Sequence, residues 1–525
     1  MMKTITSHYF LPEISYNMGC MSIVSEIELN HSNSPPNNVI SPLRDSTLLV
    51  SAEFFAISFG LLSQIILTRG LKTAEFGMWI LLFDMGLTIF MLTDTGLSTL
   101  ISREIPRNKR HSLVALKSVV KTQILFSLIA ISAITLLAPF LWDRVSIFAE
   151  MTVILVFIGT WGVSISPPFR TFLRSTGKAS WEAVFRVSER MVLTLGFLLV
   201  LEKGGDSSDF AIVIAIVPLI TSSLLILSSF VHATRISNPE GQISRDMISH
   251  EQDFTMKKII QRALPFFIFI AALQLLDRAD KFILAFHVPL DYIATYGISL
   301  MVYFSGMTVI RVIRNVIMPW LSEVDQKDQS LVKRYNQATF YIYSIIPIGI
   351  MTALLIMLTI PIVIFPEDLI YPNHEKFSSE SIFRFLLITW SLNMVVSPAW
   401  EAIRAFRKAS LINSISISGL ISSVIFGVFF IPILGIYAAA MMTIVAPMVF
   451  LFLTHFAMES GLKEALDKSY FQIVSIMTLF SFCPLILFIP GLSTISGFTI
   501  LLCASLMVEI MLFSSRKSFN ISMEN

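Results

Sequence analysis

Long apolar segments recur along the chain from Leu48 almost to its C-terminal end. Each is close to the length that an α-helix needs to cross roughly 30 Å of hydrocarbon, about 20 residues. The pattern therefore predicts an all-α polytopic membrane protein with about fourteen transmembrane helices. The predicted spans are 48–68, 77–100, 122–142, 150–169, 184–202, 210–231, 264–286, 293–320, 337–365, 381–400, 411–432, 434–456, 470–490 and 494–514.

The fifth span has the weakest pattern, because only 191–201 is cleanly apolar and Arg186, Glu189 and Arg190 stand at its start. Without this span, every later helix would be inverted. Basic residues outside the spans decide between the two topologies, because cytosolic loops are enriched in Lys and Arg. With the N-terminus inside, and with the inner ends of the fifth and eighth spans (up to 190 and from 311) counted as inner segments, thirty Lys and Arg are inner, five lie on outer loops and three lie within spans. Both termini are therefore predicted to be cytosolic.

Two internal echoes indicate that the first twelve spans arose by duplication. After the fourth span the chain reads SPPFRTFLRSTGKAS (166–180), and after the tenth it reads SPAWEAIRAFRKAS (397–410). A fainter echo joins ILTRGLKTAEFG (66–77) to ILAFHVPLDYIATYG (283–297), and each ends in an aromatic residue followed by glycine. Convergent loop chemistry could produce either echo alone, but their corresponding positions favour duplication.

The duplication predicts how the chain is divided into domains. A disordered cytosolic tail (1–46) precedes an N-lobe of spans 1–6 (47–231), a cytosolic linker (232–263) and a C-lobe of spans 7–12 (264–456). Residues 457–525 add spans 13 and 14 and a cytosolic C-terminus. Each lobe has an even number of spans, so the two parallel six-helix lobes share one orientation. The substrate path is expected between them.

Composition excludes several classes of function. Apolar residues make up 54% of the chain and charged residues 14%, whereas about 25% are charged in an ordinary globular protein. The net charge of +2 is too small for a nucleic-acid binder. The cysteines (Cys20, Cys483 and Cys503) have no disulfide or metal-site spacing. The chain lacks HExxH, GxSxG and Walker motifs, and its predicted outer loops are short, so we expect a protein that is not an enzyme and carries no catalytic residue, metal or cofactor.

Three segments resemble a family of membrane transporters. The stretch 68–107 contains Glu-Phe-Gly (75–77), Asp-x-Gly-Leu (94–97) and Arg-Glu (103–104). The stretch LLDRADKFILAFHVPLDYIATYGISL (275–300) and the helix exit IMPWLSEV (317–324) follow. In order and spacing these resemble the O-antigen-type lipid-linked oligosaccharide flippases for polysaccharide biosynthesis, in the multidrug/oligosaccharidyl-lipid/polysaccharide exporter superfamily.

The resemblance implies a function in the cell membrane. It implies that a polyprenyl-(pyro)phosphate-linked oligosaccharide is moved from the cytosolic to the outer leaflet by alternating access without ATP. Such a transporter needs a hydrated cavity for the glycan, cations for the phosphates and a lateral opening for the polyprenyl tail. The implied partners are this substrate, membrane lipids, and a glycan polymerase or glycosyltransferases of the same pathway.

The seventh span carries the densest set of charges. Ionisable groups inside a membrane are costly, so they are functional candidates. On a helix that advances 100° per residue, the polar side chains of this span fall within about 160° of arc; they are Gln274, Asp277, Arg278, Asp280 and Lys281. If they face the cavity, Arg278 and Lys281 hold the pyrophosphate, and the two aspartates set their charge. The alternative is that Asp277 and Lys281 form an i,i+4 pair inside a packed interface.

Three carboxylates of the first lobe are candidates for coupling to H⁺ or Na⁺. They are Glu53 on span 1 and Asp84 and Asp94 on span 2. A carboxylate taken out of water holds a proton more readily, and several converging oxygens would bind Na⁺. Asp84, which lies about seven residues in from the predicted outer end of span 2, is the best coupling candidate. Glu53 could instead be an interfacial residue, and Asp94 could bind backbone at a helix end.

Other functions remain open from the sequence. The alternatives within the superfamily are a cation-coupled multidrug exporter and a flippase for peptidoglycan precursors. A drug exporter would favour an acidic or aromatic cavity without central cations, and Arg278 and Lys281 argue against it. A polymerase or ligase acting on the lipid-linked glycan is disfavoured by the short outer loops.

Overall fold

A computed structural model describes most of the chain. The described residues are 42–94, 96–106, 111–145, 147–237, 256–322, 329–364, 379–406, 409–457, 468–489 and 494–514. The predicted tail up to residue 41, the middle of the predicted linker and residues 515–525 lie outside them. Helices α9 and α11 both extend into the range predicted as linker.

Within the described residues, every regular element is a helix. They are α2 (Pro42–Gly70), α3 (Thr73–Phe90), η1 (Met91–Thr93), α4 (Leu97–Glu104), α5 (Ser112–Val145), α6 (Glu150–Ile165), α7 (Pro167–Ser175), α8 (Ala179–Glu202), α9 (Ser207–Ser237), α11 (Met256–Ala285), α12 (Leu290–Ser322), α13 (Gln329–Ile364), α15 (Ser379–Phe406), α16 (Ala409–Leu434), α17 (Ile436–Phe456), α18 (Lys468–Ser481), η6 (Cys483–Phe488) and α19 (Thr494–Ser514).

The helices confirm the predicted fold class. Most predicted spans correspond to one long helix, but the second covers α3, η1 and α4, the fourth covers α6 and the start of α7, and the thirteenth covers α18 and η6. Twelve described helices are long and apolar enough to cross a membrane, and the bent helix α11 would be a thirteenth. Helix α8, which matches the weak fifth span, is 24 residues long and differs from the others in its charged first half.

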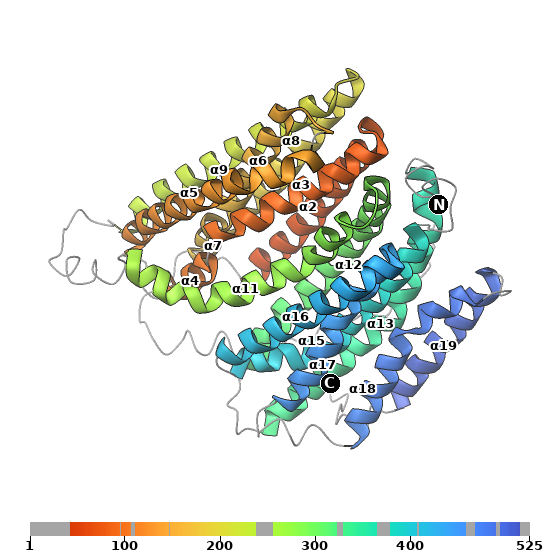
Figure 1. The fold of residues 1–525 in the computed structure, drawn as a ribbon. Helices are drawn as coiled ribbons and strands as arrows, with labels where there is room; N and C mark the ends of the chain where they lie inside the picture. Colours follow the sequence, from red (N-terminus) through yellow and green to blue (C-terminus); the bar gives the residue numbers. More distant parts are fainter. Residues whose placement is uncertain are drawn as a thin grey trace, which may run out of the picture.

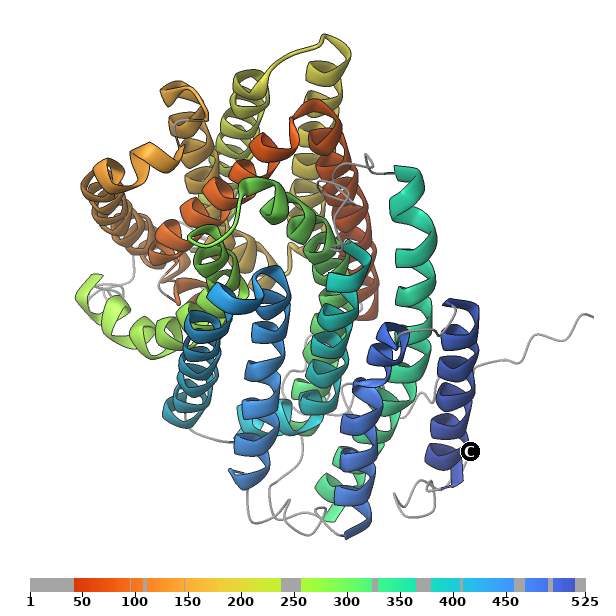
Figure 2. The same cartoon turned by 45° about the vertical axis from the view of Figure 1, so that its right-hand side comes forward.

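The helices fall into two groups that are visible in two views (Figures 1 and 2). We call α2 to α9 the first-half group and α11 to α17 the second-half group. Inside each, neighbouring helices pack closely: α2 lies along α8 and α6 along α9, while α15 lies along α12 and α17. Helices α18 and α19 lie at the margin, against α15 and α13. The longest shared boundary between the groups is the contact of α3 with α12.

Helix α11 passes from one group to the other. Its first residues, including Ile259 and Ala263, are buried in an apolar cluster with side chains of α4, α5 and α7. Further along, Leu273 and Leu276 pack against a cluster of the second-half group. The helix bends by 56° between these two parts, at Pro265. Proline lacks an amide donor and is a common cause of such bends.

The contact between α3 and α12 depends on two glycines, and we call it the α3–α12 seam. A Cβ atom added to Gly77 would overlap the carbonyl oxygen of Leu290, and one added to Gly297 would overlap the side chain of Ile80. Gly77 and Gly297 are the final residues of the two similar segments, 66–77 and 283–297, that form the fainter echo in the sequence. The fainter of the two echoes thus supplies the close contact between the groups.

We expect Gly77→Ala to destabilise the protein, because the added methyl group forces the backbones of α3 and α12 apart. Overpacking of this kind costs about 1–3 kcal/mol. Gly60→Ala on α2 is the matched control, since nothing lies within 4 Å of its added Cβ atom. That change should stabilise the helix by about 0.5–1 kcal/mol. The denaturation midpoints of the two detergent-solubilised variants measure the difference, and equal midpoints would contradict the close contact.

The thirteenth span changes from α-helix to 3₁₀-helix at the boundary between α18 and η6. Arg384 of α15 stabilises this break. Its Nη1 donates a hydrogen bond to the carbonyl of Leu487 (2.9 Å), it pairs with Glu380, and its guanidinium lies 4.9 Å from the ring centre of Phe488. An unsatisfied carbonyl in hydrocarbon is costly, so the arginine compensates for a carbonyl at an irregular part of the span.

Candidate functional site

A cavity of about 430 Å³ lies between the two groups of helices. Its wall on the first-half side comes from α2, α3, α7 and α8, and its wall on the second-half side comes from α11 and α12. Much of the lining is apolar or aromatic, as with Trp79, Phe83 and Phe304. The cavity therefore lies where the sequence places the substrate path.

Cations outnumber carboxylates in the cavity wall. Five of the lining residues are cationic: Arg170, Arg186, Arg190, Lys281 and Arg311. Only two, Glu53 and Asp84, are acidic. Low-dielectric walls strengthen the field of charges in a cleft and raise the local concentration of counter-ions. The arrangement favours an anionic ligand.

Arg186 and Arg190 stand four residues apart on α8, so they lie on one face of the helix. Arg186 pairs with Glu53 of α2 and with Glu182 one turn earlier, at 2.5 Å from the latter. Glu182 is fully buried. Because the pair with Glu53 joins α8 to α2 and Glu182 is buried, the charged face of this helix points into the protein. This explains how a helix with a weak apolar pattern takes its place in the bundle.

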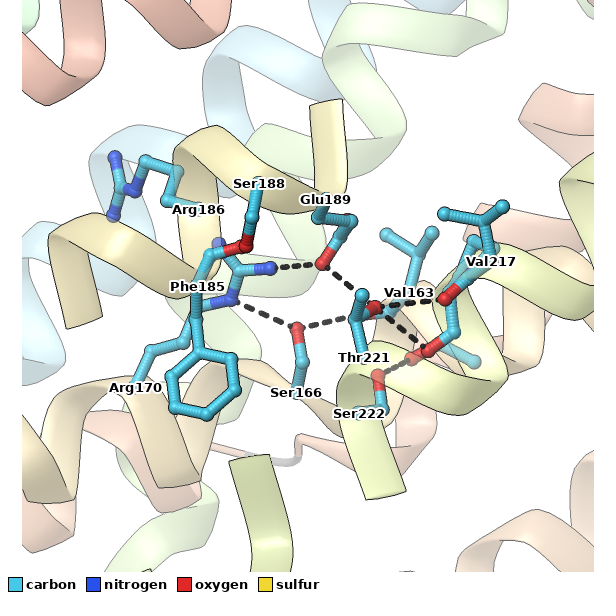
Figure 3. A network of polar contacts seen from close by, with 12 residues as sticks. Val163, Ser166, Arg170, Phe185, Arg186, Ser188, Glu189, Val217, Thr221 and Ser222 are labelled. Carbon is cyan, nitrogen blue, oxygen red and sulfur yellow. Dashed lines mark hydrogen bonds and ion pairs between the residues drawn. The ribbon is translucent and has the colours of Figure 1, made fainter. Parts of the chain in front are cut away.

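The third cation, Arg170, is held by a polar network between α7, α8 and α9 (Figure 3). Its Nη2 lies 2.5 Å from Glu189 Oε2, and its Nε donates to Ser166 Oγ at 3.2 Å. Thr221 Oγ1 donates to the same carboxylate oxygen at 3.2 Å. Figure 3 shows Arg186 pointing away from this network. Glu189 thus orients Arg170, and its charge compensates that arginine.

Arg190 and Arg311 differ from the other cations because neither forms an ion pair with a described residue. Arg311 of α12 donates to Thr308 Oγ1 on its own helix (2.9 Å). Arg190 of α8 lines the cavity from the opposite group. A cation without a carboxylate partner keeps its donors available for a ligand. These two arginines, one from each group, are the strongest candidates for direct contact with an anion.

The residues predicted on the seventh span take different positions. Lys281 lines the cavity. Arg278 does not; it donates to the carbonyl of Gln274 (2.9 Å) and to that residue's side chain. Asp280 is buried and accepts a hydrogen bond from Tyr296 at 2.5 Å. Asp277 has an exposed side chain and is not part of the cavity wall.

The proposed internal pair of Asp277 and Lys281 is not formed. The carboxylate that pairs with Lys281 is Asp84, on a helix of the other group. Arg278 pairs with the same carboxylate, at 3.3 Å. Sequence spacing identified the charged face of α11. It did not identify Asp84 as the partner of Lys281, because the two residues lie far apart in the sequence.

Of the three carboxylates predicted as coupling candidates, two lie in the cavity wall and one lies outside it. Asp84 and Glu53 both line the cavity, and both are paired with cations. Asp94 does not line it; its Oδ1 accepts hydrogen bonds from the amide (2.9 Å) and the hydroxyl (3.0 Å) of Ser98, at the start of α4. This is the helix-end role considered as its alternative. Among the described residues, no group of three His, Cys, Asp or Glu side chains could hold a metal ion.

Sequence reasoning did not identify four of the five cations of the cavity wall: Arg170, Arg186, Arg190 and Arg311. Arg186 and Arg190 were interpreted as a weakness of the fifth span, and Arg170 as part of an inner loop. The available signal was charge inside a segment that the loop count requires to be a span, because such charges usually face a protein interior or a wet cavity. Applied to the fifth span as to the seventh, the same rule would have identified Arg186 and Arg190.

A sequence model of the family described as "Polysaccharide biosynthesis protein" matches residues 43–325. This is more than half of the chain. The chain belongs to the polysaccharide biosynthesis protein family. The family assignment from sequence resemblance is thereby confirmed.

Solved structures share the fold of this member of the polysaccharide biosynthesis protein family. One is described as "Lipid II flippase MurJ, inward closed conformation" (TM-score 0.60, 15% identity, 90% of this chain and 100% of that chain covered). Another is an inward-facing multidrug resistance MATE family transporter of the MOP superfamily (0.54, 16%, 81% and 99%). A third is a MOP superfamily transporter from Pyrococcus furiosus whose description refers to reversed polarity of its binding pocket (0.51, 14%, 83% and 95%). No curated protein sequence matches the chain.

The cavity lies entirely in the part of the chain that the polysaccharide biosynthesis family model matches. Its lining residues run from Glu53 to Arg311, within 43–325. The chain shares its fold with these flippase and exporter structures, and its family is that of the polysaccharide biosynthesis proteins. The site is a cationic cavity between two groups of helices of this fold.

Proposed function

We propose that this protein is a flippase that moves a polyprenyl-(pyro)phosphate-linked oligosaccharide across the cell membrane for the export of a surface polysaccharide or glycan. The observation that carries the proposal is the charge of the cavity, where five cations face two carboxylates. A phosphate-bearing headgroup is the ligand whose charge this wall complements. The family description, which names polysaccharide biosynthesis, agrees with a sugar substrate.

Each part of the substrate has a suitable environment in the proposed mechanism. Arg190 and Arg311 bind the phosphates, since guanidinium groups form strong charge-assisted hydrogen bonds with phosphate oxygens. Trp79, Phe83 and Phe304 give the sugars aromatic surfaces on which to pack. The polyprenyl tail stays in the lipid. The two groups of helices then alternate in exposing the cavity to either side, with both termini in the cytosol and with H⁺ or Na⁺ as coupling ion.

A multidrug exporter for organic cations is the second candidate, because such transporters share the fold. The cavity charge disfavours it, since a wall with an excess of cations repels a cationic drug. A peptidoglycan-precursor flippase shares the fold as well, and its substrate would have the same anionic linkage. The saccharide therefore distinguishes these two flippases, and the charge distinguishes both from the exporter.

Reconstitution tests the proposal directly. We expect proteoliposomes containing the protein to transfer a fluorescent short-chain polyprenyl-pyrophosphate saccharide between leaflets faster than protein-free liposomes, measured by quenching from outside. Comparing the transfer rates of a lipid with a peptidoglycan-type saccharide and a lipid with a surface-polysaccharide-type saccharide distinguishes the two kinds of flippase. Accumulation of an organic cation without transfer of any pyrophosphate lipid would contradict the proposal and favour the exporter.

A further inference from the structure

Asp84 is a carboxylate in a cavity wall that is mostly cationic. It lies on α3 and pairs with two cations of α11: Arg278, at 3.3 Å between Nε and Oδ1, and Lys281. The three side chains are 14%, 13% and 4% exposed, so water screens their charges only weakly. This ion triad joins the first-half group to the second-half group.

Lys281 is the member of the triad that a ligand can reach together with Asp84. Both residues line the cavity, whereas Arg278 does not. The Nζ atom of Lys281 also lies 5.5 Å from the ring centre of Phe304, another lining residue. An anion in the cavity therefore competes with Asp84 first at Lys281.

The triad lies next to the α3–α12 seam. Ile80, one helical turn before Asp84, occupies the space beside Gly297 that a side chain at that position would need. The same stretch of α3 thus touches α12 through apolar contacts and α11 through charge. Parting the two groups along this seam requires that both contacts break.

Breaking the triad without a replacement anion is strongly unfavourable. Removing one partner from a buried ion pair leaves a charge without compensation. A neutral or cationic ligand cannot supply that compensation, but a phosphate or pyrophosphate can. The exchange of one anion for another keeps Lys281 neutralised, while Arg278 keeps its hydrogen bonds to Gln274, and α3 is freed.

We propose that Asp84 is a specificity-determining residue of translocation: it is the resident counter-ion of Lys281 and Arg278, and only an anionic headgroup can replace it and release α3 from α11. This inference rests on the proposed function, because it takes the phosphate-bearing headgroup as the ligand. It adds the step by which the headgroup charge selects the substrate and opens the seam.

A disulfide reporter across the seam tests the exchange. The full-length protein, with Cys20, Cys483 and Cys503 replaced by serine, receives Ile80→Cys and Gly297→Cys. We expect rapid oxidative cross-linking without ligand and slower cross-linking with inorganic pyrophosphate. Asp84→Asn should lower the ligand-free rate about tenfold, as a difference of about 1.4 kcal/mol would, and remove the response to pyrophosphate. An Asp84→Asn protein that cross-links at the parent rate and still responds would overturn the proposal.

Two further variants frame this result. Glu75→Gln makes the same chemical change on the same helix, at a residue that accepts a hydrogen bond from the amide of Lys72 (3.1 Å) and does not line the cavity. It should cross-link and respond as the parent does. If Asp84→Asn does not accumulate, Lys281→Gln decides: Arg278 still pairs with Asp84 and preserves cross-linking, while the response to pyrophosphate is lost. A preserved response in Lys281→Gln would refute the exchange.

The transfer assay separates this proposal from the proposed function. The parent should transfer a pyrophosphate lipid faster than an uncharged polyprenyl glycoside. In Asp84→Asn the ratio of these two transfer rates should be about tenfold smaller, because opening of the seam no longer requires anion exchange. Transfer with an unchanged preference in Asp84→Asn overturns the role of Asp84 alone. No transfer of any pyrophosphate lipid by the parent contradicts the proposed function itself.

Discussion

Replacing Arg190 and Arg311 together with glutamine should reduce transfer of a polyprenyl-pyrophosphate saccharide about 100-fold or more, because each hydrogen bond to a charged group contributes about 1.5–3 kcal/mol. The fold should tolerate the change, since neither arginine forms an ion pair with a described residue. Leaflet transfer in proteoliposomes measures the loss, and the detergent denaturation midpoint checks the fold.

Lys203→Gln provides a matched control for this pair. Lys203 follows the last residue of α8, is exposed and does not line the cavity. Its loss should leave transfer within about twofold of the parent, as expected for a surface charge. If the double arginine variant transfers at the parent rate with a normal midpoint, the two arginines do not bind the phosphates.

Glu189→Gln should cause a large loss of stability. The change removes the charge that compensates Arg170, at 2.5 Å, and leaves a largely buried guanidinium without its partner. Removal of one partner from a buried pair costs about 3–5 kcal/mol. The expected result is a clear decrease in the denaturation midpoint of the detergent-solubilised protein.

A second replacement on α8 tests whether the change from a carboxylate to an amide by itself lowers the stability. Glu202→Gln, at the exposed end of α8, should leave the midpoint nearly unchanged. The double variant Glu189→Gln with Arg170→Gln should regain much of the lost stability, because it removes the unpaired cation together with its former partner. A double variant no more stable than Glu189→Gln would show that the ion pair is not the cause.

The sequence predicted the helices well because the length of an apolar segment is a local property that the bilayer imposes directly. All fourteen predicted ranges coincide with helical segments of the structure. The sequence also identified Lys281, Asp84 and Glu53, which line the cavity, since a charge inside a span stands out without any knowledge of its surroundings. For Asp94 the sequence left two roles open, a coupling site and a helix-end contact, and the structure shows the second, with Ser98 four residues away as the partner.

Contacts between distant segments were beyond the sequence. Asp84 was considered as a coupling site and Lys281 as half of an i,i+4 pair, yet the two form an ion pair between α3 and α11. The charges of the fifth span weakened its pattern for the same reason: Arg186 and Arg190 belong to a cavity whose other wall is more than 80 residues away in the chain.

By itself, the sequence determined that this is a helical membrane protein, where its helices lie and to which family it belongs. Hydrocarbon demands long apolar helices, so each span can be recognised from its own residues. Only the tertiary structure decided which charges compensate one another and which of them face a cavity. That outcome depends on which helix faces meet, and a single helix does not contain this information.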